Sequence, residues 1–176
     1  MKTLVLVFHP NIGQSKINKR WIQELSKYPE KFLVHELYKV YPDEIINVSK
    51  EKDLIESHDK IVFQFPFYWF NCPPMLKKWL DEVLTYGWAY GSNSGYMVSG
   101  KKITLAISAG IDEEEYSPTG KYKYTIKQLT APFELTFEYV KADYRPQFVY
   151  YGMEFKSSAD WIEKSVPMYI NFLDSI

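Results

Sequence analysis

Short, largely apolar runs recur along this chain, and segments with helix signals lie between them. Three of the runs are clear, at residues 3–8, 60–65 and 102–107, and two less uniformly apolar ones lie at 32–37 and 147–151. A run that is apolar at nearly every position is typical of a strand covered on both faces, as in a parallel sheet. Strands that alternate with helices predict an α/β fold in which helices cover both faces of that sheet.

The expected helices occupy the segments between and after these runs. Ser15 is a good helix N-cap, and Pro73 with Pro74 favours a helix start at its first turn. Pro132 lies inside a helical pattern, where it either kinks the helix or begins its main part. The helical segments are 15–28, 51–57, 73–84, 124–137 and 158–173. The order of elements predicts one domain over residues 1–176, a three-layer sandwich with a five-stranded parallel sheet.

Charge and cysteine content exclude several classes of protein. The formal net charge is -1, which gives no electrostatic footprint for nucleic acid. No run reaches the roughly 18 apolar residues of a membrane-spanning helix, so we expect no direct membrane insertion. Cys72 is the only cysteine, which favours a reducing compartment and a cytoplasmic protein. The three histidines are far apart in sequence and offer no metal-ligand spacing, so no metal site is expected.

Three loops are expected to carry the function. Ligands of open parallel sheets bind outside the carboxyl ends of the strands. The loops that follow the first, third and fourth apolar runs in the sheet are 9–15, 66–72 and 108–122. We expect these three segments to meet at one edge of the sheet.

The first loop leads into a helix, and the free N–H groups of a helix start suit a phosphate. Ser15 and Asn18 offer side-chain donors there, and Lys16 offers charge. Many helices that begin with serine bind nothing, so this loop alone is a weak signal. His9 either packs at the strand end or faces a ligand. Neither a Walker-type sequence nor G-x-G-x-x-G is present.

The second loop contains a block of four aromatic residues, 67–70, directly after a strand. Aromatic residues make up 18% of the chain, which indicates either a core built from rings or a ring-lined pocket or self-interface. A loop position fits the core explanation poorly for this block. Flat aromatic walls at the end of a parallel strand suit a flat ligand such as a flavin. Cys72 in the same loop is either reactive or a packed, inert thiol.

The same stretch resembles a known family. Residues 65–70, the following Pro73-Pro74-Met-Leu-Lys-Lys-Trp, and Gly87-Trp-Ala-Tyr90 are similar to the signature of the NAD(P)H quinone oxidoreductases. That family has a flavodoxin-like fold. The similarity extends back to His9 and forward to the loop after residue 107. The short chain most resembles the bacterial branch that includes ancillary subunits of glutathione-regulated potassium-efflux systems.

The resemblance implies roles for specific residues. The flavin phosphate would be held by the first loop, the flavin ring would lie against the second and third loops, and a tyrosine would line the substrate cavity. The residues implied for the phosphate are His9, Ser15, Lys16, Ile17 and Asn18, those for the ring are Pro66, Phe67, Tyr68, Trp69, Phe70, Ser108, Ala109, Gly110 and Tyr116, and the cavity residue is Tyr90.

The third loop departs from the family pattern. The family typically has Thr-Thr-Gly-Gly where this chain has Ser108-Ala109-Gly110-Ile111. Tyr116 matches a family tyrosine near the N1/O2 edge of the flavin, where a phenol donor stabilises negative charge. Tyr122 stands where the mammalian enzymes have histidine, and the bacterial branch often has tyrosine. By resemblance, Tyr116 and Tyr122 are the catalytic residues.

The resemblance also implies an activity. NAD(P)H would reduce the flavin at N5, and a quinone or similar electrophile would then accept the two electrons in a ping-pong reaction. FMN is expected in preference to FAD, and a homodimer is expected with loop 86–96 in its interface. Two other hypotheses remain open. One is a regulatory ancillary subunit of a potassium-efflux transporter, and the other is a one-electron carrier of the flavodoxin type.

Overall fold

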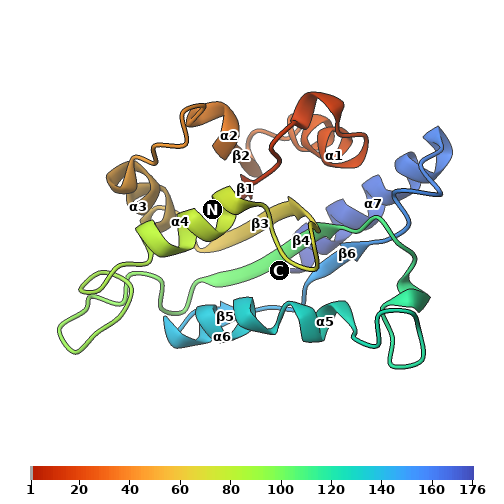
Figure 1. Cartoon of the computed structure of the whole chain (residues 1–176). Coiled ribbons are helices and arrows are strands. Elements are labelled where there is room, and N and C mark those ends of the chain that lie inside the picture. The colour runs from red at the N-terminus through yellow and green to blue at the C-terminus, as the bar shows by residue number, and fades with distance from the viewer. Residues whose placement is uncertain (1) are drawn as a thin grey trace.

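The computed structural model describes residues 2–176, which form a parallel sheet between two layers of helices (Figure 1). The strand order is β2-β1-β3-β4, with β5 and β6 both paired to β4, and every pairing is parallel. The strands are β1 (Thr3–Val7), β2 (Phe32–Glu36), β3 (Lys60–Pro66), β4 (Lys102–Ser108), β5 (Asp143–Tyr144) and β6 (Phe148–Tyr150). The predicted α/β sandwich is confirmed.

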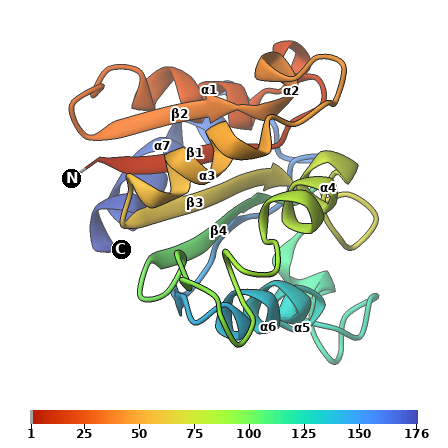
Figure 2. The ribbon, with the colours of Figure 1, turned by 90° about the vertical axis from the view of Figure 1, so that its left-hand side faces the viewer.

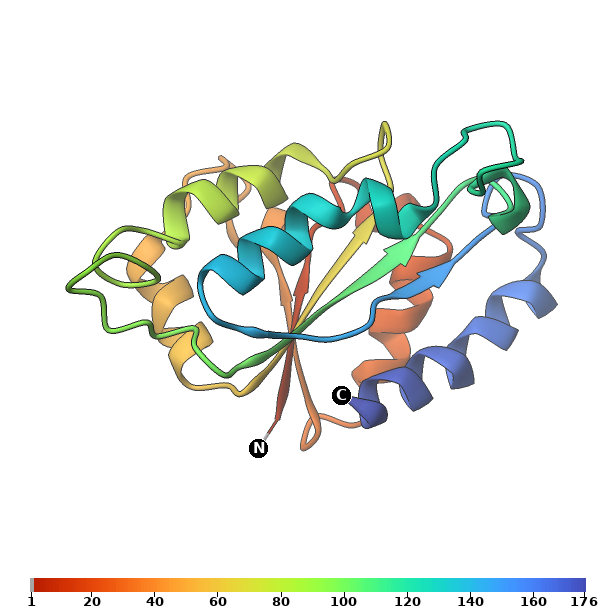
Figure 3. The same ribbon diagram turned by 90° about the horizontal axis from the view of Figure 1, so that it is seen from below.

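Helices cover both faces of the sheet (Figure 3). Two helices, α1 (Ile17–Leu25) and α7 (Ala159–Ser175), pack together on one face. The other face is covered by α2 (Leu37–Val40), α3 (Val48–Glu56), α4 (Pro74–Val83), α5 (Ile126–Leu129) and α6 (Ala131–Tyr139), and two short 3-10 turns lie in loops at Ile12–Gln14 and Glu113–Glu115. No helix of residues 2–176 combines the length and the apolar character that a membrane crossing requires.

Burial on both faces explains the apolar runs. Along β1, Leu4 and Leu6 belong to the core under α3, α4 and α6, whereas Val5 and Val7 belong to the core under α1 and α7. Each of these four side chains is at most 2% exposed. Successive side chains of a strand point to opposite faces, so a strand between two helical layers must be apolar throughout.

The last strand differs from its prediction. One strand was expected at residues 147–151, but the sheet edge is formed by two short pieces, β5 and β6. Pro146 lies between them, has no N–H to donate to the ladder, and therefore interrupts it. The carbonyl oxygen of Pro146 instead accepts a hydrogen bond from Oγ1 of Thr104, at 2.8 Å. The sheet consequently has six strands where five were predicted.

Two helix boundaries also differ from their predictions. The helix α3 begins at Val48, earlier than expected, because the Asn47 side chain accepts a hydrogen bond from the Lys50 amide and caps it. The pattern at 124–137 is two helices that meet at Thr130, and Pro132 lies in the first turn of the second. Of the two roles considered for Pro132, the helix start is therefore confirmed. The short helix α2 was not predicted.

The buried carboxylate of Glu51, on α3, links this helix to β2, to the end of α2 and to α4. Glu51 is 0% exposed, and its Oε1 atom lies 2.8 Å from His35 Nε2 and accepts a hydrogen bond from the Tyr41 hydroxyl at 2.7 Å. The indole N–H of Trp79 donates to Oε2 at 2.8 Å. Desolvation alone would raise the pKa of Glu51, but the hydrogen bonds from His35, Trp79 and Tyr41 hold it below its ordinary value.

We expect Glu51→Ala to lower the free energy of unfolding by about 3 kcal/mol, because it leaves several buried polar groups without their partner. The lowered pKa means that the ionised carboxyl stabilises the folded state above the unfolded-state pKa, and this stabilisation is lost as the pH falls through the folded-state value. Urea unfolding between pH 7 and pH 3 measures both effects.

Two variants serve as comparisons for this measurement. Glu51→Gln keeps the size of the side chain but cannot ionise, so its stability should depend less on acid pH than that of the wild type. Glu163→Gln alters an exposed carboxylate that pairs with Arg20 at the surface, and should leave stability almost unchanged. Equal acid sensitivity in the wild type and Glu51→Gln would contradict the role given to Glu51.

Candidate functional site

The carboxyl ends of β1, β3 and β4 lie at the same edge of the sheet, and the three predicted loops meet there (Figure 2). Backbone hydrogen bonds join them. The Phe67 amide donates to the Ser108 carbonyl at 2.9 Å, and the Phe8 amide donates to the Gln64 carbonyl at 2.8 Å. The strand register therefore fixes where each loop begins relative to its neighbours at this edge of the sheet.

In the first loop, the N-terminus of α1 has the features of an anion site. The Ser15 hydroxyl oxygen accepts a hydrogen bond from the Asn18 amide at 3.1 Å, as predicted for a cap. Within residues 2–176, no group accepts a hydrogen bond from the amides of Lys16 and Ile17. Those two N–H groups are free to bind a ligand, and the helix dipole favours an anion.

Side chains of the same loop have other partners. The Lys16 ammonium group donates to Ser157 Oγ at 2.9 Å, and so ties this loop to the segment before α7. Nδ1 of His9 accepts a hydrogen bond from the Asn11 amide at 3.2 Å. Burial lowers the pKa of His9, which favours the neutral imidazole.

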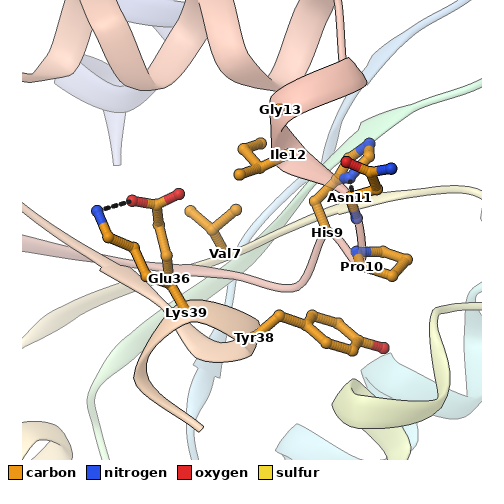
Figure 4. Close-up of a pocket in the computed structure, with 9 residues that line it drawn as sticks. All are labelled: Val7, His9, Pro10, Asn11, Ile12, Gly13, Glu36, Tyr38 and Lys39. Carbon is orange, nitrogen blue, oxygen red and sulfur yellow. Dashed lines mark hydrogen bonds and ion pairs between the residues drawn. The ribbon is translucent and has the colours of Figure 1, made fainter. Parts of the chain in front are cut away.

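A pocket of about 230 Å³ lies between this loop and the end of β2 (Figure 4). Its walls come from the turn after β1 and from α2, and His9 is the one predicted site residue among them. The lining residues are Val7, His9, Pro10, Asn11, Ile12, Gly13, Glu36, Tyr38 and Lys39. Because the second and third loops contribute nothing to these walls, the pocket is beside the predicted ring site and not within it.

The second loop turns sharply at its aromatic residues. Tyr68 and Asn71 pair with each other through two backbone hydrogen bonds, of 3.0 and 2.9 Å. The two residues between them, Trp69 and Phe70, have φ angles of 49° and 60°, so both adopt the left-handed conformation of a type I′ turn. Each costs about 1–2 kcal/mol relative to right-handed backbone. Strain of this kind is characteristic of functional sites.

This turn leaves binding groups accessible. Trp69 is 93% exposed, whereas Tyr68 and Phe70 are 40% and 42% exposed. No acceptor in the described part of the chain pairs with the amides of Trp69 and Phe70. The loop therefore presents two free N–H groups and exposed ring surface at the end of β3. Pro66, the last residue of β3, is itself buried.

Aromatic contacts join the second loop to the third. Tyr116 packs edge-on against Phe67, with ring centroids 6.1 Å apart, and lies beside Tyr122 at 5.0 Å. Tyr122 in turn contacts Phe70 edge-on at 5.0 Å. The structure thus brings both predicted catalytic tyrosines together with two of the predicted ring-wall residues. Desolvation by burial raises the pKa of Tyr116 to about 12, with smaller contributions from Tyr122 and Glu154, so its phenol keeps its proton at neutral pH.

The segment after β4 offers fewer free groups than its sequence suggests. The Ala109 side chain is fully buried, and the Ala109 amide donates to the Tyr150 carbonyl at 2.9 Å. That amide is therefore not available to a ligand. At Gly110 a side chain would meet the Glu154 carboxylate, 2.8 Å from where its Cβ would stand. The Glu154 amide also donates to the Gly110 carbonyl at 2.9 Å.

A fourth loop, residues 151–157, was missed at the sequence level. It lies beside the first and third loops through Lys16 and Gly110. Tyr151 packs against Tyr116 at 6.0 Å, and burial raises its pKa to about 12. Because β6 is parallel to its neighbours, the loop after it also ends at this edge, and the order of elements could have been used to infer this, although its residues carry no recognisable motif.

The predicted cavity residue Tyr90 is not part of this cluster, and neither is Cys72, for which a reactive and an inert thiol were both considered. Tyr90 contacts Tyr86 at 5.8 Å and Tyr139 at 5.5 Å, in the loop after α4 and on α6. Cys72 is partly buried, and desolvation raises its pKa to about 11, which favours the inert thiol over the reactive one. No group of three or more metal-binding side chains occurs in the portion of the chain that the structure describes.

Comparison with known proteins gives a consistent family match. A family model described as a flavodoxin-like fold matches residues 1–170. General stress protein 14 of Bacillus subtilis is 48% identical over 91% of this chain and 90% of its own length. An uncharacterised NAD(P)H oxidoreductase of the same organism, YrkL, is 44% identical over 98% of both chains. The ancillary protein KefG of a glutathione-regulated potassium-efflux system, from Cronobacter sakazakii, is 40% identical over 77% of this chain and 72% of its own length.

Solved structures agree with these relatives. General stress protein 14 of Treponema denticola, crystallised in complex with FMN, has 47% sequence identity and a TM-score of 0.93, and the match covers 99% of both chains. An NADPH-quinone reductase from P. pentosaceus has 26% identity and a TM-score of 0.87, and the match covers 98% of both chains.

Proposed function

Because this chain belongs to the flavodoxin-like family that includes NAD(P)H oxidoreductases, we propose that it binds FMN and reduces a quinone-type acceptor with electrons from NADH or NADPH. The observation that carries the proposal is the strained turn at residues 69–70. This turn holds two unpaired amides and exposed rings beside a protonated tyrosine, at the end of a parallel strand. An NAD(P)H oxidoreductase relative, an FMN-bound neighbour and an NADPH-quinone reductase neighbour support it.

The residues present fit FMN. A phosphate would take the free amides of Lys16 and Ile17 at the start of α1, with Ser15 supporting the helix end. The polar edge of a flavin ring would take the amides of Trp69 and Phe70. Side chains of 67–70 would line the ring, together with the backbone of 108–110, while the buried Pro66 would hold the start of the loop in place. When bound, the flavin would supply the two-electron chemistry that links NAD(P)H to the acceptor.

The chain itself would position the reactants and stabilise charge. The ring cluster of Phe67, Phe70, Tyr116 and Tyr122 would exclude water from one side of the site. The Tyr116 phenol, protonated because its pKa is about 12, would donate a hydrogen bond where negative charge develops. Tyr122 would support Tyr116 by packing, and a flat electrophile such as a quinone would stack in the open space above the turn.

A homodimer is part of this proposal. The helix α6 buries Phe133 and Phe137, yet its outer face also carries Leu135 and Tyr139, which are 65% and 69% exposed. A helix that is apolar on several faces is normally covered on all of them. The Tyr139 ring contacts Tyr90, so the exposed surface of α6 is continuous with the tyrosines of loop 86–96. A second copy on this surface would bring Tyr90 to a site shared between subunits.

The purified protein should be yellow, or should become yellow on addition of FMN, and NADH or NADPH should bleach it under anaerobic conditions. Addition of a quinone should then restore the colour. Absorbance at the flavin maximum measures each step. A preparation that remains colourless with FMN and with FAD would contradict the proposal. A well-populated one-electron state in a redox titration would favour the flavodoxin-type carrier.

Replacement of Tyr116 by Phe should slow reduction by NAD(P)H by about tenfold to a hundredfold, the effect of one hydrogen bond to a charged group. FMN should stay bound, because the ring that packs on Phe67 is retained. Anaerobic stopped-flow absorbance measures the rate. Tyr124→Phe is the matched control, since Tyr124 is 56% exposed and lies outside the ring cluster. Equal rates in the wild type and Tyr116→Phe would remove the role assigned to this phenol.

The double variant Leu135→Lys, Tyr139→Lys should be monomeric where the wild type is dimeric, because two charges on this face prevent its burial. Light scattering after gel filtration measures the mass. Phe155→Lys, which alters a residue 74% exposed in the loop before α7, should leave the dimer intact. A wild-type protein that is monomeric at every concentration tested would contradict the homodimer.

A role as an ancillary subunit of a potassium-efflux transporter is a second candidate. It is favoured by the similarity to KefG, an ancillary protein of such a system. Co-purification of a membrane transporter with the tagged protein would support this role. Recovery of the protein from cells without any transporter, combined with full reductase activity, would favour the independent enzyme.

A further inference from the structure

Four buried polar side chains form one chain of hydrogen bonds from α7 to the end of β4. The Tyr169 hydroxyl donates to Gln64 Oε1 at 2.8 Å. Gln64 Nε2 donates to Asn18 Oδ1 at 3.1 Å, and Asn18 Nδ2 donates to Ser108 Oγ at 2.8 Å. Tyr169 and Gln64 are 0% exposed, Asn18 is 2% exposed and Ser108 is 7% exposed. We call these four residues the buried relay.

Each hydrogen bond of the buried relay has its donor on the Tyr169 side and its acceptor on the Ser108 side or the reverse, and we call this the direction of the relay. The Tyr169 phenol fixes the orientation of the first amide, that of Gln64. Burial raises the pKa of the Tyr169 phenol well above its ordinary value, so the proton stays on the oxygen. Gln64 Oε1 is its one acceptor in the described part of the chain. If the Gln64 amide were turned around, its NH₂ group would face the phenol and the phenol proton would lose its partner. An unpaired buried donor costs about 1–3 kcal/mol.

The direction is fixed a second time at Asn18. The backbone carbonyl oxygen of Asn18 lies 3.4 Å from Gln64 Nε2. A carbonyl oxygen can only accept a hydrogen bond, so the end of Gln64 that faces it must be the NH₂ group. The Asn18 side chain then has to present Oδ1 to Gln64, and its own NH₂ group is directed at Ser108.

This direction determines what the Ser108 hydroxyl can do. Its oxygen accepts a hydrogen bond from Asn18, and no group in residues 2–176 accepts its proton. Ser108 is the last residue of β4, and its carbonyl oxygen binds the amide of Phe67 in the ring-wall loop. Its proton is thus available at the point where the first, second and third loops meet. Had the relay run the other way, the Ser108 hydroxyl would donate to Asn18 and offer a ligand only lone pairs.

We propose that Tyr169 and Gln64 are positioning residues that, through Asn18, hold the Ser108 hydroxyl as a hydrogen-bond donor toward an oxygen atom of the bound flavin. The inference rests on the proposed function, because it takes the ligand to be a flavin. It also assigns Asn18 a different task from phosphate binding. Its amide is bound to Ser15 and its side chain to Ser108 and Gln64, so it orients another donor instead of meeting the ligand.

The test is a double-mutant cycle on flavin affinity, measured by fluorescence quenching when the apoprotein is added to FMN or riboflavin. Tyr169→Phe removes the shorter of the two contacts that fix the direction of the relay and leaves only the 3.4 Å contact between Gln64 Nε2 and the Asn18 carbonyl oxygen. It should weaken FMN binding by about threefold to tenfold, the worth of one hydrogen bond. Ser108→Ala should weaken binding by a similar factor. In the Ser108→Ala background, Tyr169→Phe should have no further effect, because the donor that it orients is absent.

Two more variants separate positioning from general stability. Gln64→Met keeps the length of the side chain without polar atoms and should reproduce the behaviour of Tyr169→Phe in both backgrounds. Ser165→Ala removes another fully buried hydroxyl from α7, which accepts from the Trp21 indole N–H at 2.8 Å and has no link to Ser108. It should lower the stability to urea but leave flavin affinity unchanged.

The outcomes distinguish the inference from the proposed function. Non-additive effects in the cycle support the relay. If they appear with FMN and not with riboflavin, the accepting oxygen is on the phosphate; if they appear with both, it is on the remainder of the flavin. Equal weakening by Tyr169→Phe in both backgrounds, or no weakening, overturns the relay while flavin binding stands. A wild-type protein that binds neither flavin overturns both.

Discussion

The burial of β3 and β4 on both faces is the constraint on which the site depends. The two strands pair in register along seven residue pairs, from Lys60 with Lys102 to Pro66 with Ser108. One further hydrogen bond, from the Phe67 amide to the Ser108 carbonyl, carries that register into the loops. A slip by one residue would turn every side chain of β3 to the opposite face. Gln64 would then face α4 and α6, and the buried relay could not form.

The strained turn at Trp69 and Phe70 depends on this rigid base. Two consecutive aromatic residues in left-handed backbone cost about 2–4 kcal/mol together, a large part of the stability of a domain of this size. The paired residues on either side, Tyr68 and Asn71, hold the turn closed, and Phe70 regains contact area on Tyr122. Glycine or asparagine would satisfy this turn without strain. The fold alone gains little from an indole that is 93% exposed, so the packing of Trp69 does not offset this strain.

The sequence alone predicted the elements whose pattern is periodic and missed those whose cause is a single contact. Strands such as β1 and β3 can be recognised in the sequence because burial on both faces requires an apolar residue at almost every position. The division of the last strand at Pro146 and the early start of α3 at Asn47 depend on one proline and one side-chain cap. The same holds for the site. The ring block at 67–70 was visible as a motif, whereas the contribution of residues 151–157 follows only from how the chain returns to this edge.

Polar residues inside apolar patterns were signals in the sequence that could have predicted buried hydrogen-bond networks. Gln64 interrupts an otherwise apolar strand, and Glu51 lies on a helix whose other acidic residues face solvent. Each is 0% exposed and has all its partners inside the protein. From the sequence, the nature of those partners could not be inferred, because they come from elements distant along the chain. A buried polar side chain in such a pattern nevertheless predicts that several partners must exist.

The abundance of tyrosine gains a physical meaning from these contacts. The core explanation of the aromatic content is confirmed, since rings such as Trp79 and Phe63 fill the core, while Trp69 and Phe70 stay exposed at the strand ends. Tyrosine adds what phenylalanine cannot, a directional proton inside an apolar layer. The hydroxyls of Tyr41, Tyr150 and Tyr169 each donate to an oxygen acceptor, on Glu51, Trp161 and Gln64 respectively. A buried phenol with one acceptor has its hydroxyl proton in one orientation. This orientation in turn fixes which atoms of the accepting side chain can donate to the next group. In the proposed relay, the Tyr169 phenol, on the face of the sheet opposite α4, sets the direction of the hydrogen bonds that end at Ser108, at the carboxyl end of β4.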